Sequence, residues 1–127
     1  MITEINSRNF DEQVLRSELP VLACFVAPWC HSCFSTCLLA NNLAEQYAGK
    51  MKFVKVDVEK SPEIQARYHI IALPSIIFFH QAQPLERRLG YQEKTSLRHL
   101  LDTLLTEGHR LTATAEPDDR ETRRQPR

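Results

Sequence analysis

An unbroken apolar run, Val21–Val26, is the feature that most constrains how this chain can fold. A strand with one solvent-exposed face alternates apolar and polar residues, whereas a strand buried on both faces is apolar throughout. The run therefore predicts a strand inside a sheet that has helices on both sides. A second apolar run at 75–79 predicts another buried strand, and the alternating, β-branched segment 52–58 predicts a third.

Helices are predicted around these strands where apolar residues recur every three or four positions. Each predicted helix has a capping or stop residue beside it, and the four are 10–15 after Asn9, 32–48 before Gly49, 62–68 after Ser61, and 97–105 before Gly108. In the longest, one buried face is expected to comprise Cys33, Cys37, Ala40, Ala44 and Tyr47, widened by Leu39 and Leu43.

The remaining segments complete one α/β domain with a mixed sheet. Residues 85–89 are charged and only weakly apolar, which is typical of an edge strand. Residues 109–127 are rich in charge and poor in apolar side chains, so they cannot bury enough surface to offset the entropy of ordering. The sequence therefore predicts a folded domain over 1–108 and a disordered charged tail over 109–127.

Charge and hydropathy exclude several classes of partner. Lys plus Arg and Asp plus Glu each total 16, so the formal net charge is zero and nothing attracts the whole molecule to nucleic acid or anionic lipid. Its apolar runs are far shorter than the roughly 20 residues that span a bilayer. Residues 1–13 are polar where a secretory leader would be apolar, so we expect a cytoplasmic protein. We also expect the protein to be a monomer.

The sequence Trp29-Cys30-His31-Ser32-Cys33 falls where the central strand gives way to the long helix. Cys30 at the helix start would lie among backbone N–H groups that have no partner inside the helix, and those groups favour a thiolate. A thiolate is the attacking species in disulfide exchange. Cys33, one turn later, would then attack the mixed disulfide and release the product.

Two other interpretations of the cysteines are weaker. A structural zinc site wants four ligands, and one C-x-x-C supplies two, with His31 and Cys37 the only candidates nearby. We therefore expect no metal and no other cofactor. Buried thiols that only fill space are the other interpretation, and it suits Cys24 and Cys37 better than the C-x-x-C pair, which we expect to be redox-active in a reducing cytosol.

Several motifs in order give the chain a resemblance to the thioredoxin family over roughly residues 1–108. They are Phe25-Val26-Ala27-Pro28-Trp29-Cys30-x-x-Cys33, Val54-Lys55-Val56-Asp57-Val58, Tyr68-His69-Ile70-Ile71-Ala72-Leu73-Pro74-Ser75, and Gly90. The resemblance implies the thioredoxin fold, with a cis Leu73–Pro74 peptide that faces the dithiol. It also implies that an extended substrate binds in a groove lined by Trp29, Leu73, Pro74, Leu89 and Gly90.

The departures from the family concern the tuning of the dithiol. His31 and Ser32 replace the usual Gly-Pro, and a protonated His31 would stabilise the Cys30 thiolate and make the disulfide more oxidising. Cys24 stands where the family usually has a buried Asp that helps to deprotonate the second cysteine, so Lys55 would lose its usual partner. Either the mixed disulfide would be released more slowly or water would carry out the proton transfer instead. Phe34 replaces a basic residue, which adds apolar area at the dithiol end and removes a positive charge. Leu38 replaces a helix-kinking proline, so a straighter helix is expected.

The expected function is reduction of protein disulfides through a Cys30/Cys33 dithiol–disulfide cycle that serves electron transport and cell redox homeostasis. The expected partners are disulfide-containing proteins and an electron donor of the thioredoxin reductase type. Two alternatives remain open from the sequence. The His31-Ser32 insert would suit a disulfide oxidase or isomerase, and the fold could also serve as a binding module with an incidental dithiol.

Overall fold

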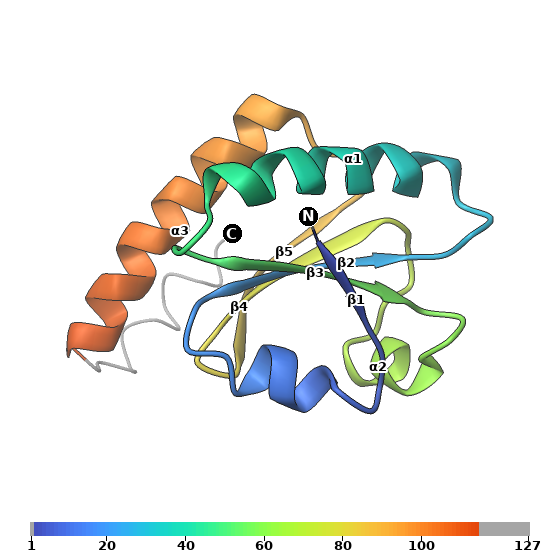
Figure 1. Cartoon of the computed structure of the whole chain (residues 1–127), viewed down its shortest axis with the longest axis horizontal. Helices are drawn as coiled ribbons and strands as arrows, with labels where there is room; N and C mark the ends of the chain where they lie inside the picture. The colour runs from blue at the N-terminus through green and yellow to red at the C-terminus, as the bar shows by residue number, and fades with distance from the viewer. Residues whose placement is uncertain (1, 115–127) are drawn as a thin grey trace. The chain divides into compact units, whose positions relative to one another are not determined.

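A five-stranded mixed sheet forms the centre of the protein in the computed structural model, which describes the backbone of residues 2–114 (Figure 1). The strand order is β1-β3-β2-β4-β5. The strands are β1 (Thr3–Ile5), β2 (Val21–Val26), β3 (Lys52–Asp57), β4 (Ser75–His80) and β5 (Gln83–Leu89). Contacts along the chain define two units, Met1–Lys94, which holds the whole sheet, and Thr95–Arg127.

The central strand β2 has the environment that its composition predicts. Every residue of β2 is buried. It pairs in parallel with β3, where Cys24 lies opposite Lys55, and antiparallel with β4, where Phe25 lies opposite Ser75. Because β2 is parallel to one neighbour and antiparallel to the other, its carboxyl end meets the start of β4 at one end of the sheet.

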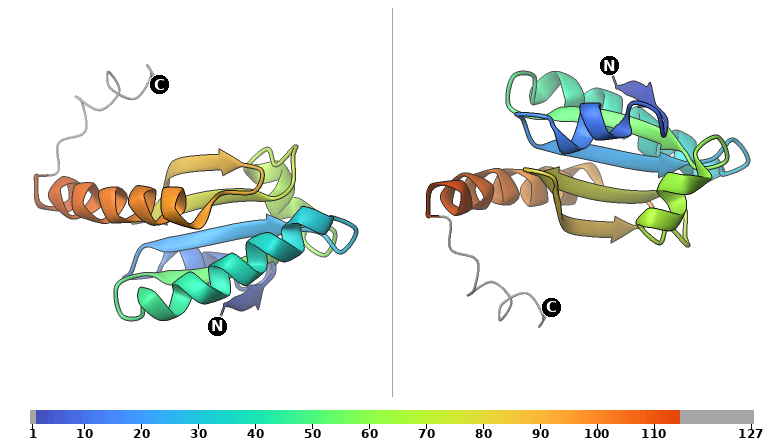
Figure 2. Two further views of the ribbon diagram at one scale, coloured as in Figure 1. Left: turned by 90° about the horizontal axis from the view of Figure 1, so that it is seen from above. Right: turned by 90° about the horizontal axis from the view of Figure 1, so that it is seen from below.

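Helices cover both faces of this sheet within the first unit, as expected. The long helix α1 (His31–Gln46) lies on one face, and η1 (Asp11–Leu15) and α2 (Pro62–Arg67) lie on the other (Figures 1 and 2). The core on the η1 side is made by alternate strand residues and by Phe10, whose ring contacts Phe79 at 5.9 Å and Tyr68 at 5.6 Å between centroids. Residues that share this core include Val21, Ala23, Phe25, Val54, Val56, Ile64 and Ile77.

The buried face of α1 differs slightly from the predicted one. Thr36 is buried, whereas Cys37 is only half-buried, so the face is rotated by about one residue from the predicted stripe. The spacing of apolar residues does not predict this face correctly, because one of the buried positions is occupied by a threonine, a polar residue. The buried residues are Cys33, Thr36, Leu39, Ala40 and Leu43, and Tyr47 follows them just past the end of the helix. Gly49 has φ +83°, the left-handed conformation predicted for it.

Of two predicted helix caps, the one at Asn9 is wrong and the one at Ser61 is confirmed in position. The side chain of Asn9 accepts a hydrogen bond from the Asn6 N–H rather than capping η1, which is a single π-helical turn. Ser61 is the N-cap residue of α2 with Pro62 at the first helical position, as predicted, but its buried hydroxyl accepts a hydrogen bond from the Ser7 N–H and makes no capping bond. In both cases a tertiary or turn contact uses the side-chain oxygen that the local pattern assigns to the helix.

The edges of the sheet were predicted only in part. The edge strand β5 is confirmed, and the turn before it contains Gln81 and Ala82, both at positive φ. The opposite edge, β1, was not predicted. It is short, and only Ile5 in it is buried, so its sequence carries almost no periodic signal. It is held by parallel pairing with β3, a long-range contact that local patterns do not reveal.

The second unit contains α3 (Lys94–Thr114), in which Leu97, Leu101 and Leu104 are buried. The predicted stop at Gly108 is wrong, because the helix continues through it. A glycine in a helix interior costs only about 1 kcal/mol, and helix-compatible neighbours outweigh that cost. Residues 109–114, predicted to be disordered, belong to this helix, and residues 115–127 of the predicted tail lie outside the described residues. No helix among the described residues has the length and hydropathy to cross a membrane.

The aromatic cluster predicts where the fold is most sensitive. Phe79 has no exposed surface and contacts Tyr68 edge-on at 5.3 Å as well as Phe10. We expect Phe79→Ala to lower the free energy of unfolding by about 3–5 kcal/mol, measured by urea denaturation. Leu19→Ala is the control, since Leu19 is exposed and its loss should change stability by less than about 0.5 kcal/mol. Equal effects of the two variants would contradict this assignment of the core.

Candidate functional site: a dithiol at the start of a helix

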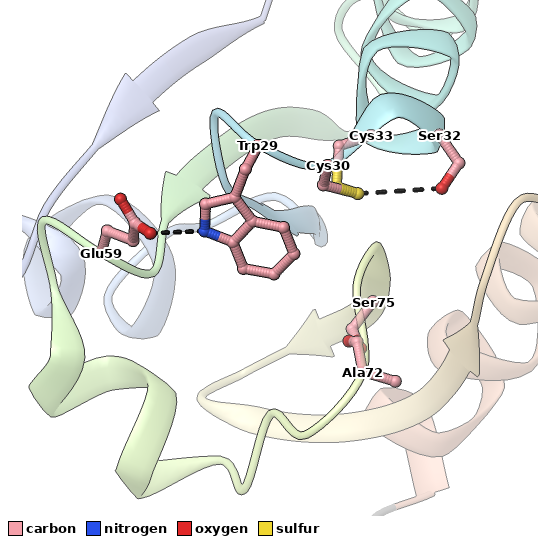
Figure 3. The surroundings of a disulfide bond; sticks show 7 residues. All are labelled: Trp29, Cys30, Ser32, Cys33, Glu59, Ala72 and Ser75. Carbon is pink, nitrogen blue, oxygen red and sulfur yellow. Dashed lines mark hydrogen bonds between the residues drawn. A yellow bond between two sulfur atoms is a disulfide. The ribbon is translucent and has the colours of Figure 1, made fainter.

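Cys30 and Cys33 lie where β2 gives way to α1, and they are joined by a disulfide with Cα atoms 5.3 Å apart (Figure 3). Cys30 is the N-terminal cap residue of α1, with an extended backbone, and Cys33 is in the first turn. The Cys30 N–H donates to the carbonyl of Ala27 at 3.2 Å, and the Cys33 N–H donates to the carbonyl of Cys30 at the same distance. The chain is therefore tightly turned at the point where the two sulfurs meet.

The two cysteines differ in exposure. Cys30 is half-buried, whereas Cys33 is only 3 % exposed. An incoming disulfide can therefore reach the Cys30 sulfur more readily than the Cys33 sulfur. This is the order that the sequence predicts for an attacking and a resolving thiol.

The surroundings of Cys30 favour negative charge. No side chain caps the start of α1, and its first turn contains no acidic residue. The backbone N–H groups there and the helix dipole are thus available to an anion. The Ser32 hydroxyl lies 3.7 Å from the Cys30 sulfur, a weak hydrogen-bonding contact, and His31 is exposed (Figure 3).

Trp29 has a fixed orientation although it is 65 % exposed. Its indole N–H donates a hydrogen bond to the carboxylate of Glu59, in the loop after β3 (Figure 3). The ring thus stands beside the dithiol as an apolar surface held at one edge. Sequence reasoning missed Glu59, because nothing local links it to a residue thirty positions earlier.

The loop before β4 reaches the same end of the sheet as the dithiol. The Leu73–Pro74 peptide bond is cis, as the family resemblance implies. Ser75 lies opposite Phe25 on one side and Leu89 on the other, and its hydroxyl donates to the carbonyl of Ala72 at 2.6 Å. Figure 3 shows this loop among the surroundings of the disulfide.

A backbone hydrogen bond joins the two remaining segments expected to line the substrate groove. The Gly90 N–H donates to the carbonyl of Pro74 at 2.8 Å. Gly90 has φ +82°, a conformation that residues with a Cβ rarely adopt, and Leu89 before it is 53 % exposed. Pro74 itself is buried and Leu73 is half-buried. Four of the five predicted groove residues, Leu73, Pro74, Leu89 and Gly90, are thus connected to one another by sequence or by this hydrogen bond. The fifth, Trp29, stands beside the dithiol and bonds to Glu59 instead.

Cys24 and Cys37 are free thiols beneath the dithiol. Cys24 is fully buried, and this burial raises the pKa of its thiol to about 12. Burial also raises the pKa of Cys37, while the positive charge of Lys55 acts in the opposite direction on both thiols. Neither thiol is thus poised to ionise near neutral pH, which agrees with their predicted role in packing.

A groove of about 390 Å³ opens beside the disulfide on the α1 face of the sheet. Both cysteines of the dithiol line it, together with apolar and titratable side chains. The latter are Glu4, Cys37, Lys55 and Asp57, and the apolar ones include Val26, Phe34 and Leu38. Sequence reasoning missed Asp57, although the alternation of β3 puts it on the same face as Lys55. Among the described residues no group of three His, Cys, Asp or Glu side chains could hold a metal ion.

A family model and several known proteins similar in sequence to this chain all point to the same family. The family model described as Thioredoxin matches residues 1–103. Thioredoxin 1 of Nostoc sp. is 33 % identical over 99 residues, which are 78 % of this chain and 92 % of that protein. Thioredoxin of Synechocystis sp. is 34 % identical over 102 residues, 80 % of this chain and 95 % of that protein. Thioredoxin M5, chloroplastic, of Oryza sativa subsp. japonica is 37 % identical over 97 residues, 76 % of this chain and 56 % of that protein.

The buried Cys24 thiol predicts a specific dependence of stability on pH. The pKa of this thiol is 9.0 in a model compound and about 12 in the folded protein, so folded and unfolded chains bind the same proton below pH 9. Above pH 9 the unfolded chain loses that proton and the folded chain keeps it. Stability therefore falls as pH rises from 9 towards 12, by about 1.4 kcal/mol per pH unit.

This slope is measurable by urea unfolding at pH 8, 9.5 and 10.5, with Cys30 and Cys33 both replaced by serine to prevent disulfide exchange. In this background Cys24→Ala should lose stability less steeply above pH 9 than the protein that keeps Cys24. Parallel curves would contradict the burial of a neutral thiol at this position.

Proposed function

The chain belongs to the thioredoxin family and is a thiol–disulfide oxidoreductase of the protein-disulfide reductase type, and from this premise we propose the roles of its residues. Cys30 is the nucleophile and Cys33 is the resolving thiol. The observation that carries this assignment is the contrast between a half-buried Cys30 at an uncapped helix start and a Cys33 that is 3 % exposed.

The first half of the cycle forms a mixed disulfide. The Cys30 thiolate, stabilised by the amide groups at the start of α1, attacks one sulfur of the substrate disulfide. A bond forms between the Cys30 sulfur and that sulfur, and the other substrate sulfur leaves as a thiolate that takes a proton from solvent. The indole of Trp29, held by Glu59, excludes water from one side of the reacting sulfurs.

The second half releases the product. Cys33 loses its proton and attacks the Cys30 sulfur, one turn away, at the Cα separation of 5.3 Å that the disulfide requires. The second substrate sulfur leaves as a thiolate and is protonated. The substrate disulfide has then gained two electrons and two protons, and the protein holds the Cys30–Cys33 disulfide.

We propose that the substrate binds as an extended segment across Trp29, Leu73, Pro74, Leu89 and Gly90. Support comes from the hydrogen bond between Gly90 and Pro74, which joins the end of β5 to the start of β4 beside the dithiol. Trp29 and Leu89 add exposed apolar surface. A polypeptide backbone can pair with such a loop as it does with a sheet edge.

The cycle needs a supply of electrons, and we propose that they come from a donor of the thioredoxin reductase type. We further propose that the protein is a monomer and acts in the cytoplasm. Free thiols at Cys24 and Cys37 suit a reducing compartment, because an oxidising one favours paired cysteines. In that setting the protein would contribute to electron transport and cell redox homeostasis. The predicted boundary at residue 108 falls inside α3, which runs to Thr114, so we propose that the charged tail begins after that helix.

Loss of the nucleophile tests the assignment most directly. We expect Cys30→Ser to reduce the rate of insulin reduction to below about 1 % of wild type, because no other thiol is placed to attack first. Cys33→Ser should instead accumulate a mixed disulfide with the substrate, visible by mass spectrometry. Cys37→Ser is the matched control and should stay near wild type. Activity that survives in Cys30→Ser would contradict the proposed cycle.

The residues between the cysteines predict the reduction potential. We propose that His31, when protonated, and the Ser32 hydroxyl stabilise the Cys30 thiolate and so favour the dithiol form. Replacing them by His31→Gly with Ser32→Pro should therefore lower the potential by about 30 mV or more, measured by equilibration with glutathione. An unchanged potential would show that these two residues do not tune the couple.

A further inference from the structure

Release of the product requires that a buried thiol lose its proton. Cys33 is 3 % exposed, and only its thiolate can attack the Cys30 sulfur. A proton from such a site needs an acceptor within reach, either directly or through one water molecule. Cys33 lines the groove beside the disulfide, so a water molecule in that groove can contact its sulfur.

The titratable groups that face Cys33 across this groove come from every neighbouring element. They are Glu4 of β1, Cys37 of α1, and Lys55 and Asp57 of β3. Cys24 of β2 does not line the groove, but it interacts electrostatically with Cys37 and Lys55. A lysine ammonium has no acceptor site. The two thiols keep their own protons near neutral pH because burial raises the pKa of each. Glu4 is exposed and paired with Lys60 at 3.2 Å on the outer strand. Asp57 remains.

The position of Asp57 suits proton transfer. It is 9 % exposed, at the carboxyl end of β3, directly opposite Val26, the last residue of the strand that leads to the dithiol. Val54 and Val56 pack into the core on the η1 side, so the alternate residues Lys55 and Asp57 point to the α1 face, where both line the groove. One carboxylate oxygen accepts a hydrogen bond from the Glu59 N–H at 2.9 Å, which fixes the side chain. A carboxylate has a second oxygen with its own acceptor capacity.

We propose that Asp57 accepts the proton of Cys33 through a water molecule in the groove during release of the reduced substrate. The Cys33 S–H bond breaks, its proton passes to the water, and a proton of that water passes to the Asp57 carboxylate. The Cys33 thiolate then forms the bond to the Cys30 sulfur, and the bond from Cys30 to the substrate sulfur breaks. The departing thiolate is protonated by Asp57 through the groove, which returns the carboxylate to its starting state.

This role deepens the proposed Cys30/Cys33 cycle and rests on it. It also changes the expectation drawn from the sequence, in which Cys24 replaces a carboxyl group and no residue takes over its task. The acceptor is supplied by the neighbouring strand rather than by β2. Lys55, on the same face as Asp57, contributes a positive charge that favours thiolates in the groove.

Stopped-flow reaction of the reduced protein with an aromatic disulfide, 5,5′-dithiobis(2-nitrobenzoate), separates the two steps. Attack by Cys30 releases a first coloured thiolate, and attack by Cys33 on the mixed disulfide releases a second. We expect Asp57→Asn to slow the second phase by about 10-fold or more at pH 7 and to leave the first phase unchanged. Asparagine keeps an oxygen for the Glu59 N–H, so the local fold is preserved.

The pH profile distinguishes proton transfer from a simple effect of charge. If Asp57 accepts the proton, the second phase of Asp57→Asn should shift to higher pH, where hydroxide replaces the lost acceptor. If Asp57 acted only as a negative charge, its removal would favour the Cys33 thiolate, and the second phase would become faster at pH 7. That result, or an unchanged second phase, would overturn the proposal.

Two controls complete the experiment. Glu4→Gln removes the other carboxylate of the groove and should change neither phase. Asp57→Glu, which keeps a carboxyl group, should restore at least part of the second phase. If the wild type itself shows no second phase, or if Cys30→Ser keeps the first, the Cys30/Cys33 cycle fails, and this failure is distinct from a failure of the role of Asp57.

Discussion

The burial of β2 on both faces is the constraint on which the site depends. A strand with no wet face cannot shift its register without exposing apolar side chains, so its last residue, Val26, is fixed relative to both neighbouring strands. The tight turn that follows brings Cys30 to the start of α1, and Ser75 holds the Pro74 loop at the same end of the sheet. The dithiol and the proposed substrate surface therefore owe their mutual position to the packing of a strand that takes no part in the chemistry.

Local patterns predicted the central elements well because burial and periodicity agree there. The apolar runs of β2 and β4 and the alternation of β3 are properties of a few consecutive residues. Where tertiary contacts compete, the prediction failed. The strand β1 is stabilised by pairing with β3, the Asn9 side chain bonds to Asn6 rather than capping η1, and α3 continues past Gly108. These outcomes depend on partners far away in sequence or on summed propensities that no single residue reveals.

The candidate site divides in the same way. Cys30, Cys33 and Trp29 were found from a contiguous motif, and the cis peptide at Pro74 was expected only through the family resemblance. Asp57 and Glu59 were not identified, because their relation to the dithiol is a matter of register and of a loop that folds back onto Trp29. The free thiols Cys24 and Cys37 show that a residue's role cannot always be inferred from the family position that it occupies. The resemblance identifies Cys24 as the position of the family's buried Asp, but the raised pKa of its thiol follows from burial in this protein.

The two outer strands also bear on how the protein behaves at high concentration. An open sheet exposes unpaired N–H and C=O groups along its margins, and another chain can add to such a margin and begin aggregation. Here β1 is only three residues long, and β5 carries Pro84, which lacks an N–H, together with an exposed Arg87 and an ion pair between Glu86 and Arg88. Neither margin offers a long apolar template. Both edge strands therefore disfavour the addition of a second copy of the chain to the sheet.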